Sequence, residues 1–69
     1  MPEVWTGELI GKMHNNGVTY SDLADELGCG KSYISMVLNG KRFPQGAEKR
    51  FFSAFDRIIE KRNQINKSD

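Results

Sequence analysis

Several side chains that form hydrogen bonds stand close together in the segment 31–39. Lys31 carries an ammonium group, Ser32 and Ser35 carry hydroxyl groups, and Met36 adds an apolar side chain beside them. An ammonium group donates to the O6 and N7 atoms of guanine, and a hydroxyl group donates to or accepts from base edges. An apolar side chain contacts the methyl group of thymine. This set of groups is therefore typical of a surface that recognises another molecule by direct contact.

The other residues able to do chemistry do not predict catalysis or metal binding. The chain has one histidine, His14, and one cysteine, Cys29, which lie apart in the sequence. A zinc site needs several such ligands, and a Ser/His/Asp set cannot be assembled around one histidine at a helix end. The sequence has neither a phosphate-binding glycine loop nor a signature of paired catalytic carboxylates. We therefore expect no enzyme activity, metal or cofactor. For His14 we expect a structural role, in which the charged side chain interacts with the last carbonyl groups of its helix.

Two short helices are predicted between residues 19 and 40. Apolar residues recur there at helical spacing in two runs, which are Leu23, Ala24 and Leu27, and then Ile34, Val37 and Leu38. The first run predicts a helix over about 20–27, and the second predicts a helix over about 31–39. Ala24 is small enough for the two helices to cross steeply at close range.

Threonine and glycine residues mark the ends of these two helices. Thr19 is a predicted N-cap, with Asp22 in the first turn, where the helix dipole favours an acid. Gly28 can adopt the left-handed conformation that ends a helix, and Gly30 can stand at the N-cap of the next. Gly40 supplies the C-terminal stop of the second helix. The sequence therefore predicts a tight turn between the two helices.

Two further helices flank this pair. Helical spacing of apolar residues predicts a helix from about 3 to 16, carried by Trp5, Leu9, Ile10 and Met13. The segment 41–46 contains a proline and a glycine and predicts a loop. A longer helix from about 47 to 65 follows. We expect one all-α domain over residues 1–69, with four to five helices and a long C-terminal helix.

The predicted C-terminal helix has a wide apolar face. At about 100° per residue its apolar residues fall within an arc of about 160°, wider than a surface helix needs. These residues are Phe51, Phe52, Ala54, Phe55, Ile58, Ile59 and Ile65. One interpretation is that the three phenylalanines form a small core. The other is that Phe52 and Ile59, one heptad apart on one flank, form a partner interface with another chain.

The segment from residue 19 to residue 44 resembles a known family. The resemblance is carried by Thr19, Leu23, Ala24, Leu27, Gly28, Ser32, Ile34, Asn39 and Gly40, followed by Lys41, Arg42 and Pro44. These residues resemble the helix-turn-helix of the phage repressor and Cro (XRE-type) DNA-binding family and the basic, proline-ended loop that follows it. The resemblance implies a small lambda-repressor-like helix-turn-helix domain, with the motif at 19–40 and a long helix at about 47–65.

The resemblance also implies a function. Members of this family are sequence-specific DNA-binding transcriptional regulators, so it implies a double-stranded operator as partner and a phage or mobile-element origin. The family's base-reading positions are matched here by Lys31, Ser32, Ser35 and Met36. Its phosphate-binding positions are matched by Tyr20, Tyr33, Asn39, Lys41 and Arg42. Pseudo-palindromic operators bind dimers, and we expect a homodimer through the C-terminal helix.

Several of these assignments have alternatives. The ring of Tyr33 packs at the helix edge, or its hydroxyl group contacts phosphate. Ser32 and Ser35 are base-reading residues or ordinary surface serines. Tyr20 stands where a glutamine usually braces the phosphate and the first recognition residue, so that brace is absent or is replaced by the phenol. Without the glutamine, we expect looser base selection at Lys31.

The net charge of +1 is low for a nucleic-acid-binding protein, but the charge is unevenly distributed. Residues 1–29 have a balance of −4 and residues 30–69 a balance of +5. One interpretation is a phosphate-facing side opposite an acidic side that faces solvent, and the other is an ordinary solvated surface. The sequence predicts no disulfide, signal peptide or membrane span, so we expect a soluble, cytoplasmic protein.

A second class of function is compatible with the same fold. The low net charge, the missing glutamine and the wide apolar arc favour a protein-interaction module that binds and modulates a repressor or another protein partner. A DNA-binding subunit of a toxin–antitoxin pair is also compatible with the fold, and no residue selects it.

Overall fold

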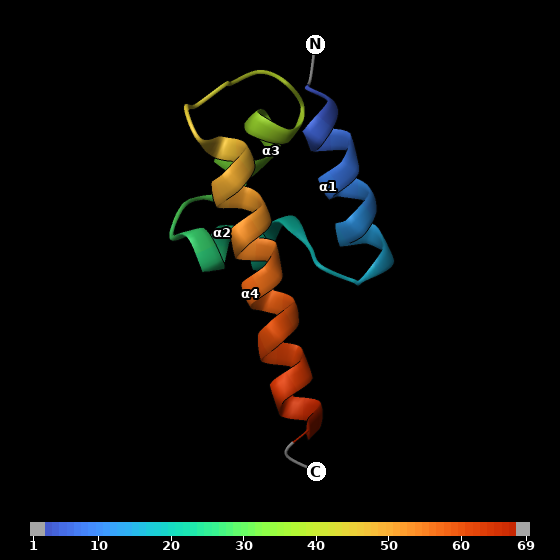
Figure 1. Cartoon of the computed structure of the whole chain (residues 1–69). Helices are drawn as coiled ribbons and strands as arrows, with labels where there is room; N and C mark the ends of the chain where they lie inside the picture. Colours follow the sequence, from blue (N-terminus) through green and yellow to red (C-terminus); the bar gives the residue numbers. More distant parts are fainter. Residues whose placement is uncertain (1–2, 68–69) are drawn as a thin grey trace.

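Four helices make up the part of the chain that the structure describes. The structure is a computed structural model, which describes the backbone of residues 3–67 and the side-chain surroundings of residues 3–63. The helices are α1 (Val4–Asn15), α2 (Tyr20–Leu27), α3 (Lys31–Leu38) and α4 (Ala47–Lys67) (Figure 1). No strand occurs within residues 3–67. The prediction of an all-α fold with a long C-terminal helix is confirmed.

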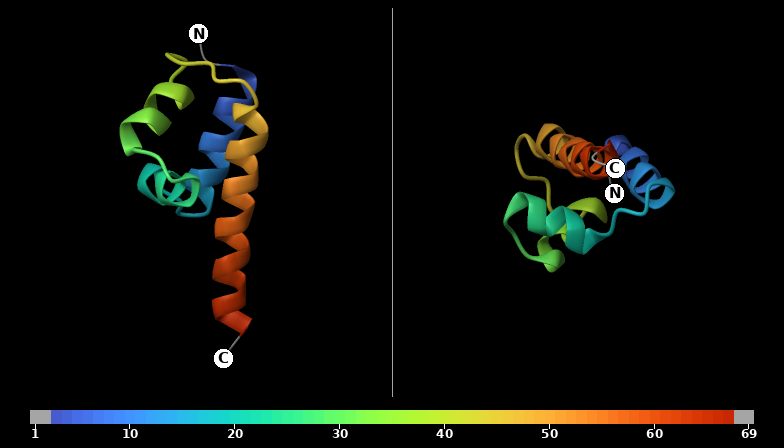
Figure 2. Two further views of the ribbon diagram at one scale, coloured as in Figure 1. Left: turned by 90° about the vertical axis from the view of Figure 1, so that its left-hand side faces the viewer. Right: turned by 90° about the horizontal axis from the view of Figure 1, so that it is seen from below.

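The helices α1 and α4 lie side by side, and α2 and α3 lie together on one side of this pair (Figure 2). The largest of the fully buried side chains between them come from all four helices: Leu9, Leu23, Ile34, Val37, Leu38 and Phe51. The ring of Phe51 meets Trp5 edge-on, with 5.7 Å between ring centroids and 81° between ring planes. This aromatic contact joins α4 to the start of α1.

The N-terminus of α2 is fixed by a reciprocal cap. The Asp22 backbone N–H donates to the Thr19 hydroxyl oxygen at 3.1 Å, and the Thr19 backbone N–H donates to the Asp22 carboxylate at 3.0 Å. The turn into α3 has Gly28 in the left-handed region, with φ 72°, and Gly30 at the N-cap. The caps and the turn predicted for this pair are confirmed.

The helices α1 and α3 end in the same motif, an asparagine followed by a glycine with positive φ. In α1 the Gly17 N–H donates to the His14 carbonyl and the Val18 N–H to the Met13 carbonyl. In α3 the Gly40 N–H donates to the Val37 carbonyl and the Lys41 N–H to the Met36 carbonyl. These paired bonds are the Schellman pattern, which satisfies the last carbonyl groups of a helix.

The apolar arc of α4 is largely covered by the chain itself. Phe51, Ala54, Phe55 and Ile58 are buried. Phe52 and Ile59 are partly buried and pack against the core, and the side chain of Ile65 lies outside the described residues. The C-terminal end of α4 extends beyond the other three helices (Figure 1). Within the described residues, none of the helices has a stretch long and apolar enough to cross a membrane.

Candidate nucleic-acid interface

The N-terminal half of α3 presents its polar side chains to solvent. Ile34 is fully buried and lies on the core-facing side of α3, whereas Lys31 and Ser32 in its first turn are exposed. Ser35 and Met36, the other two predicted base-reading residues, are partly buried. The predicted base-reading residues therefore lie along one helix, with the two most accessible in its first turn.

The loop after α3 holds two basic side chains at the surface. The backbone N–H groups of Lys41 and Arg42 both donate to the Met36 carbonyl, at 2.8 and 3.3 Å. Their side chains are exposed. In the equivalent position at the end of α1, the residue after the glycine is the buried Val18, which is the usual apolar choice for this motif. Lys41, which is exposed, therefore stands after α3 at the position that the buried Val18 holds after α1.

Asn39 caps α3 with its own amide. Its side-chain Nδ2 donates to the Ser35 carbonyl at 2.8 Å and to the Ser35 Oγ at 3.1 Å. Asn16 does the same at the end of α1, where its Nδ2 donates to the Lys12 carbonyl at 2.8 Å. An amide nitrogen has two N–H donors, and that of Asn39 lies within hydrogen-bond distance of two acceptors of Ser35. The Asn39 amide therefore caps α3, and its binding of phosphate stays a prediction.

The two tyrosines at the predicted phosphate-binding positions are attached to the core. Tyr20 begins α2 and Tyr33 lies in the first turn of α3, and both rings are partly buried and pack against the core. A tyrosine in such a position presents an apolar ring inward and a polar tip to water. The ring of Tyr33 therefore packs against the core, and contact of its hydroxyl group with phosphate stays a prediction.

Part of the positive charge of α4 is neutralised within the protein. Arg57 Nε lies 2.9 Å and Lys61 Nζ 2.7 Å from opposite carboxylate oxygens of Glu26 on α2. The side chain of Glu26 is only 14% exposed. The acidic first half and the basic second half of the sequence are thus partly paired with each other, and these two basic residues join α4 to α2 at the surface.

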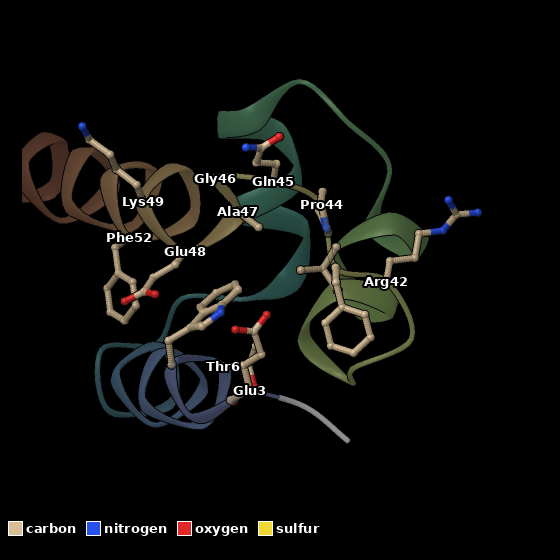
Figure 3. A pocket seen from close by; sticks show the side chains of 13 residues that line it. Glu3, Thr6, Arg42, Pro44, Gln45, Gly46, Ala47, Glu48, Lys49 and Phe52 are labelled. Atoms are coloured by element: carbon tan, nitrogen blue, oxygen red, sulfur yellow. The ribbon is translucent and has the colours of Figure 1, made fainter.

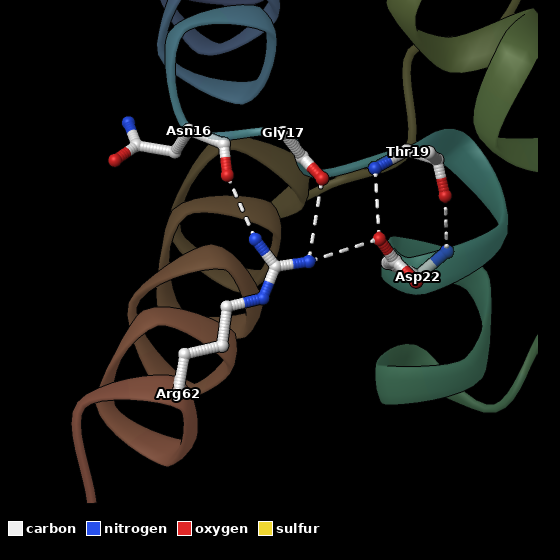
Figure 4. Close-up of polar contacts among 5 residues, drawn as sticks. All are labelled: Asn16, Gly17, Thr19, Asp22 and Arg62. Atoms are coloured by element: carbon white, nitrogen blue, oxygen red, sulfur yellow. Dashed lines mark hydrogen bonds and ion pairs between the residues drawn. The ribbon is translucent and has the colours of Figure 1, made fainter. Parts of the chain in front are cut away.

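Arg62 joins α4 to the segment between α1 and α2. Its guanidinium donates to the Asn16 carbonyl at 2.7 Å, to the Gly17 carbonyl at 3.3 Å and to the Asp22 carboxylate at 3.3 Å (Figure 4). The same carboxylate closes the cap of α2 on Thr19. Arg62 therefore fixes the end of α1 and the start of α2 with one side chain.

Two acidic residues of α2, Asp22 and Glu26, have pKa values below their ordinary range. The backbone N–H of Thr19 lowers the pKa of Asp22, assisted by the Thr19 hydroxyl and by Arg62. Hydrogen bonds from Lys61 and then Arg57 lower the pKa of Glu26. A carboxyl group with a lowered folded-state pKa stabilises the fold above its unfolded-state pKa, and this contribution is lost as the pH falls through the folded-state value. The attachment of α2 to α4 therefore weakens in acid.

A groove with an apolar floor lies between the start of α1, the 41–46 loop and the start of α4 (Figure 3). This groove, which we call the Phe43 groove, has a volume of about 730 Å³. Its apolar residues are Trp5, Val37, Phe43, Pro44, Ala47 and Phe52. No pattern in the sequence predicts this groove, although a phenylalanine within a polar loop is a signal of an exposed apolar surface. Phe52, one of the two predicted interface residues, lies in the groove, whereas Ile59 does not.

Comparisons with models of protein families, with curated proteins and with solved structures give no match to this chain.

Proposed function

We propose that this protein is a sequence-specific DNA-binding regulator of the helix-turn-helix kind, similar to phage repressors and Cro proteins. The N-terminal half of α3 enters the major groove, and α2 crosses the phosphate backbone. Lys31 and Ser32 contact base edges, with Ser35 and Met36 further along the helix. Lys41 and Arg42 contact phosphates and set the position of α3 without reading sequence.

The observation that carries this proposal is the placement of exposed polar and basic side chains at both ends of α3. Lys31 and Ser32 are exposed at its start, and Lys41 and Arg42 are exposed directly after its end. The backbone bonds from the loop to the Met36 carbonyl hold the second pair close to the helix. Basic side chains at both ends of a short helix can contact the phosphates on the two sides of a DNA groove.

The distribution of ion pairs supports the same proposal, because it leaves the basic residues on and after α3 without a partner among the described residues. Glu26 and Asp22 pair with Arg57, Lys61 and Arg62 of α4. Lys31, Lys41, Arg42, Lys49 and Arg50 form no ion pair with the described residues and are exposed. These five side chains supply the positive charge for phosphate.

Two alanine substitutions separate base reading from phosphate binding. On the duplex preferred in a selection from random DNA, Lys31→Ala is expected to weaken binding by about 1–3 kcal/mol and to relax the choice of base at one position. Arg42→Ala is expected to weaken binding to all duplexes alike, because a phosphate contact carries no sequence information. Fluorescence anisotropy with the preferred duplex and a scrambled duplex measures both effects. If the two variants behave alike on both duplexes, Lys31 does not read a base.

A second candidate function is a protein-interaction module that binds and modulates a repressor or another protein. The Phe43 groove favours it, because Phe43 is 59% exposed beside an apolar floor. The pairing of Arg57, Lys61 and Arg62 with acidic residues of their own chain also favours it, since these residues are less available to phosphate. The two functions differ in their salt dependence, because an apolar interface responds weakly to added salt and a phosphate interface responds strongly.

A further inference from the structure

We infer that Arg62, a side chain of α4, is a positioning residue for DNA binding, and that it holds Tyr20 where α2 meets the phosphate backbone. This role rests on the proposed function, in which α2 crosses that backbone. Tyr20 is the first residue of α2 and a predicted phosphate-binding residue. Arg62 acts on Tyr20 through the segment 16–19, which leads from the end of α1 into α2.

The guanidinium of Arg62 lies between this segment and the first turn of α2. Figure 4 shows it with the Asn16 and Gly17 carbonyl groups on one side and the Asp22 carboxylate on the other. Its Nη1 donates to the Asn16 carbonyl at 2.7 Å, and its Nη2 lies 3.3 Å from both the Gly17 carbonyl oxygen and the Asp22 carboxylate. Within residues 3–63, neither carbonyl group accepts a hydrogen bond from another residue. Arg62 therefore supplies the polar attachment of these two peptide groups.

The same guanidinium also contacts the cap of α2. The Asp22 oxygen that it contacts, Oδ2, is the oxygen that accepts from the Thr19 backbone N–H at 3.0 Å. Thr19 is the residue directly before Tyr20, and its hydroxyl oxygen accepts from the Asp22 N–H. A change in the position of Arg62 therefore acts on both partners of the cap and on Tyr20 next to them.

This arrangement needs an arginine rather than any cation. A guanidinium holds its donors at fixed angles on separate nitrogens, whereas a lysine ammonium is a single point of charge. An ammonium in the place of one terminal nitrogen loses the contacts of the other. The side chains of Arg62 and Asp22 are 42% and 39% exposed, and ion pairs this exposed add little to stability. We therefore expect Arg62 to affect where the start of α2 lies more than the free energy of unfolding.

Conservative exchanges at Arg62 and at its neighbour Lys61 test this role. Lys61 is the matched control, because its hydrogen bond is to Glu26 in the last turn of α2 rather than to the cap. Arg62→Lys and Lys61→Arg both keep the net charge, so neither alters the long-range attraction of DNA. We expect Arg62→Lys to weaken binding to the preferred and the scrambled duplex alike, by about 10-fold, and Lys61→Arg to leave binding unchanged.

Fluorescence anisotropy measures these affinities at about 15 °C, near the temperature at which small domains are most stable. Circular dichroism at the same temperature verifies that each variant is folded. An Arg62→Lys variant that binds like the wild type overturns the role of Arg62 and leaves the proposed function intact. A wild-type chain that binds neither duplex overturns both.

A double variant shows whether the effect passes through Tyr20. Tyr20→Phe removes only the hydroxyl group, and we expect it to weaken binding to both duplexes. If Arg62 acts through Tyr20, the double variant with Arg62→Lys binds no more than about twofold more weakly than the weaker single variant. Two effects that multiply, as those of independent sites do, overturn the role of Arg62. A Tyr20→Phe variant that binds like the wild type overturns it as well.

Asp22→Asn breaks the same contact from the side of α2, and it keeps the role testable if Arg62→Lys does not fold. Asparagine keeps an oxygen that accepts from the Thr19 N–H, but it removes the negative charge that Arg62 contacts. Loss of a negative charge near the duplex would by itself strengthen binding. We expect instead that binding to both duplexes weakens by about threefold, and stronger or unchanged binding overturns the role of Arg62.

Discussion

Replacing Phe51 with alanine is expected to lower the free energy of unfolding by about 3–5 kcal/mol. Phe51 is 1% exposed and is the largest of the fully buried side chains, and its ring is the edge-on partner of Trp5. The substitution removes apolar contacts of α4 with α1 and leaves a cavity that the surrounding helices fill only in part. A core of this size rarely supplies more than about 3–5 kcal/mol of net stability, so we expect Phe51→Ala to be largely unfolded at 25 °C.

The chain offers a matched control for this substitution. Phe43→Ala removes the same atoms from a side chain that is 59% exposed, so we expect a change within about 0.5 kcal/mol. Urea unfolding monitored by circular dichroism, at a concentration low enough to keep the protein monomeric, measures both variants. Equal losses in the two variants would show that Phe51 does not hold α4 against α1.

The affinity for the preferred duplex is expected to fall steeply as salt is added. Contacts with about four to six phosphates predict a slope of about −4 to −5 in a plot of log affinity against log salt concentration. A tenfold rise in salt would then weaken binding by roughly four to five orders of magnitude. The physical reason is that each basic side chain bound to phosphate releases a condensed counterion, and salt opposes this release.

The slope of the salt dependence also tests which individual residues contact phosphate. Lys41→Ala and Arg42→Ala are each expected to reduce the magnitude of the slope by about 1, because each removes one phosphate contact. Lys61→Ala serves as the control, since Lys61 is paired with Glu26 in the protein, and it is expected to leave the slope unchanged. Anisotropy titrations at several salt concentrations give these values. A wild-type slope near zero would favour the protein-interaction module.

The local features of the fold could be predicted from the sequence because they depend on neighbouring residues. The cap of α2 needs only Thr19 and Asp22, three residues apart. The turn into α3 needs Gly28 at a positive φ. The alternation of buried and exposed residues along α3 follows from the helical period, so the exposure of Lys31 and Ser32 was also predictable.

The contacts between distant segments could not be predicted in this way. Glu26 meets Arg57 across 31 residues, and Arg62 meets the Asn16 carbonyl across 46 residues. The spacing of apolar residues along a helix shows which face of that helix is buried. It does not show which other helix packs against this face, or at which point along the helix axis the two meet. The uneven charge of the sequence therefore does not reveal that part of it is paired at the surface, between α2 and α4.

The groove and the cap at Asn39 were missed for two different reasons. The Phe43 groove is formed by three segments that come together only after folding, so no local pattern contains it. The Asn39 amide was predicted to bind phosphate, but its position one residue after α3 also suits it to cap the helix. Asn16, in the equivalent position of α1, shows the same capping bond. The likeness between the ends of α1 and α3 is thus the feature of the sequence that indicates the capping role of Asn39.

A chemical-shift titration of the isotope-labelled chain with its preferred duplex tests directly whether the start of α3 enters the major groove. We expect the largest shifts at Lys31, Ser32, Lys41 and Arg42, and we expect them to saturate at a stoichiometric amount of DNA. Shifts confined to Trp5, Phe43 and Phe52, or no shifts at all, would contradict the proposal that the start of α3 enters the major groove.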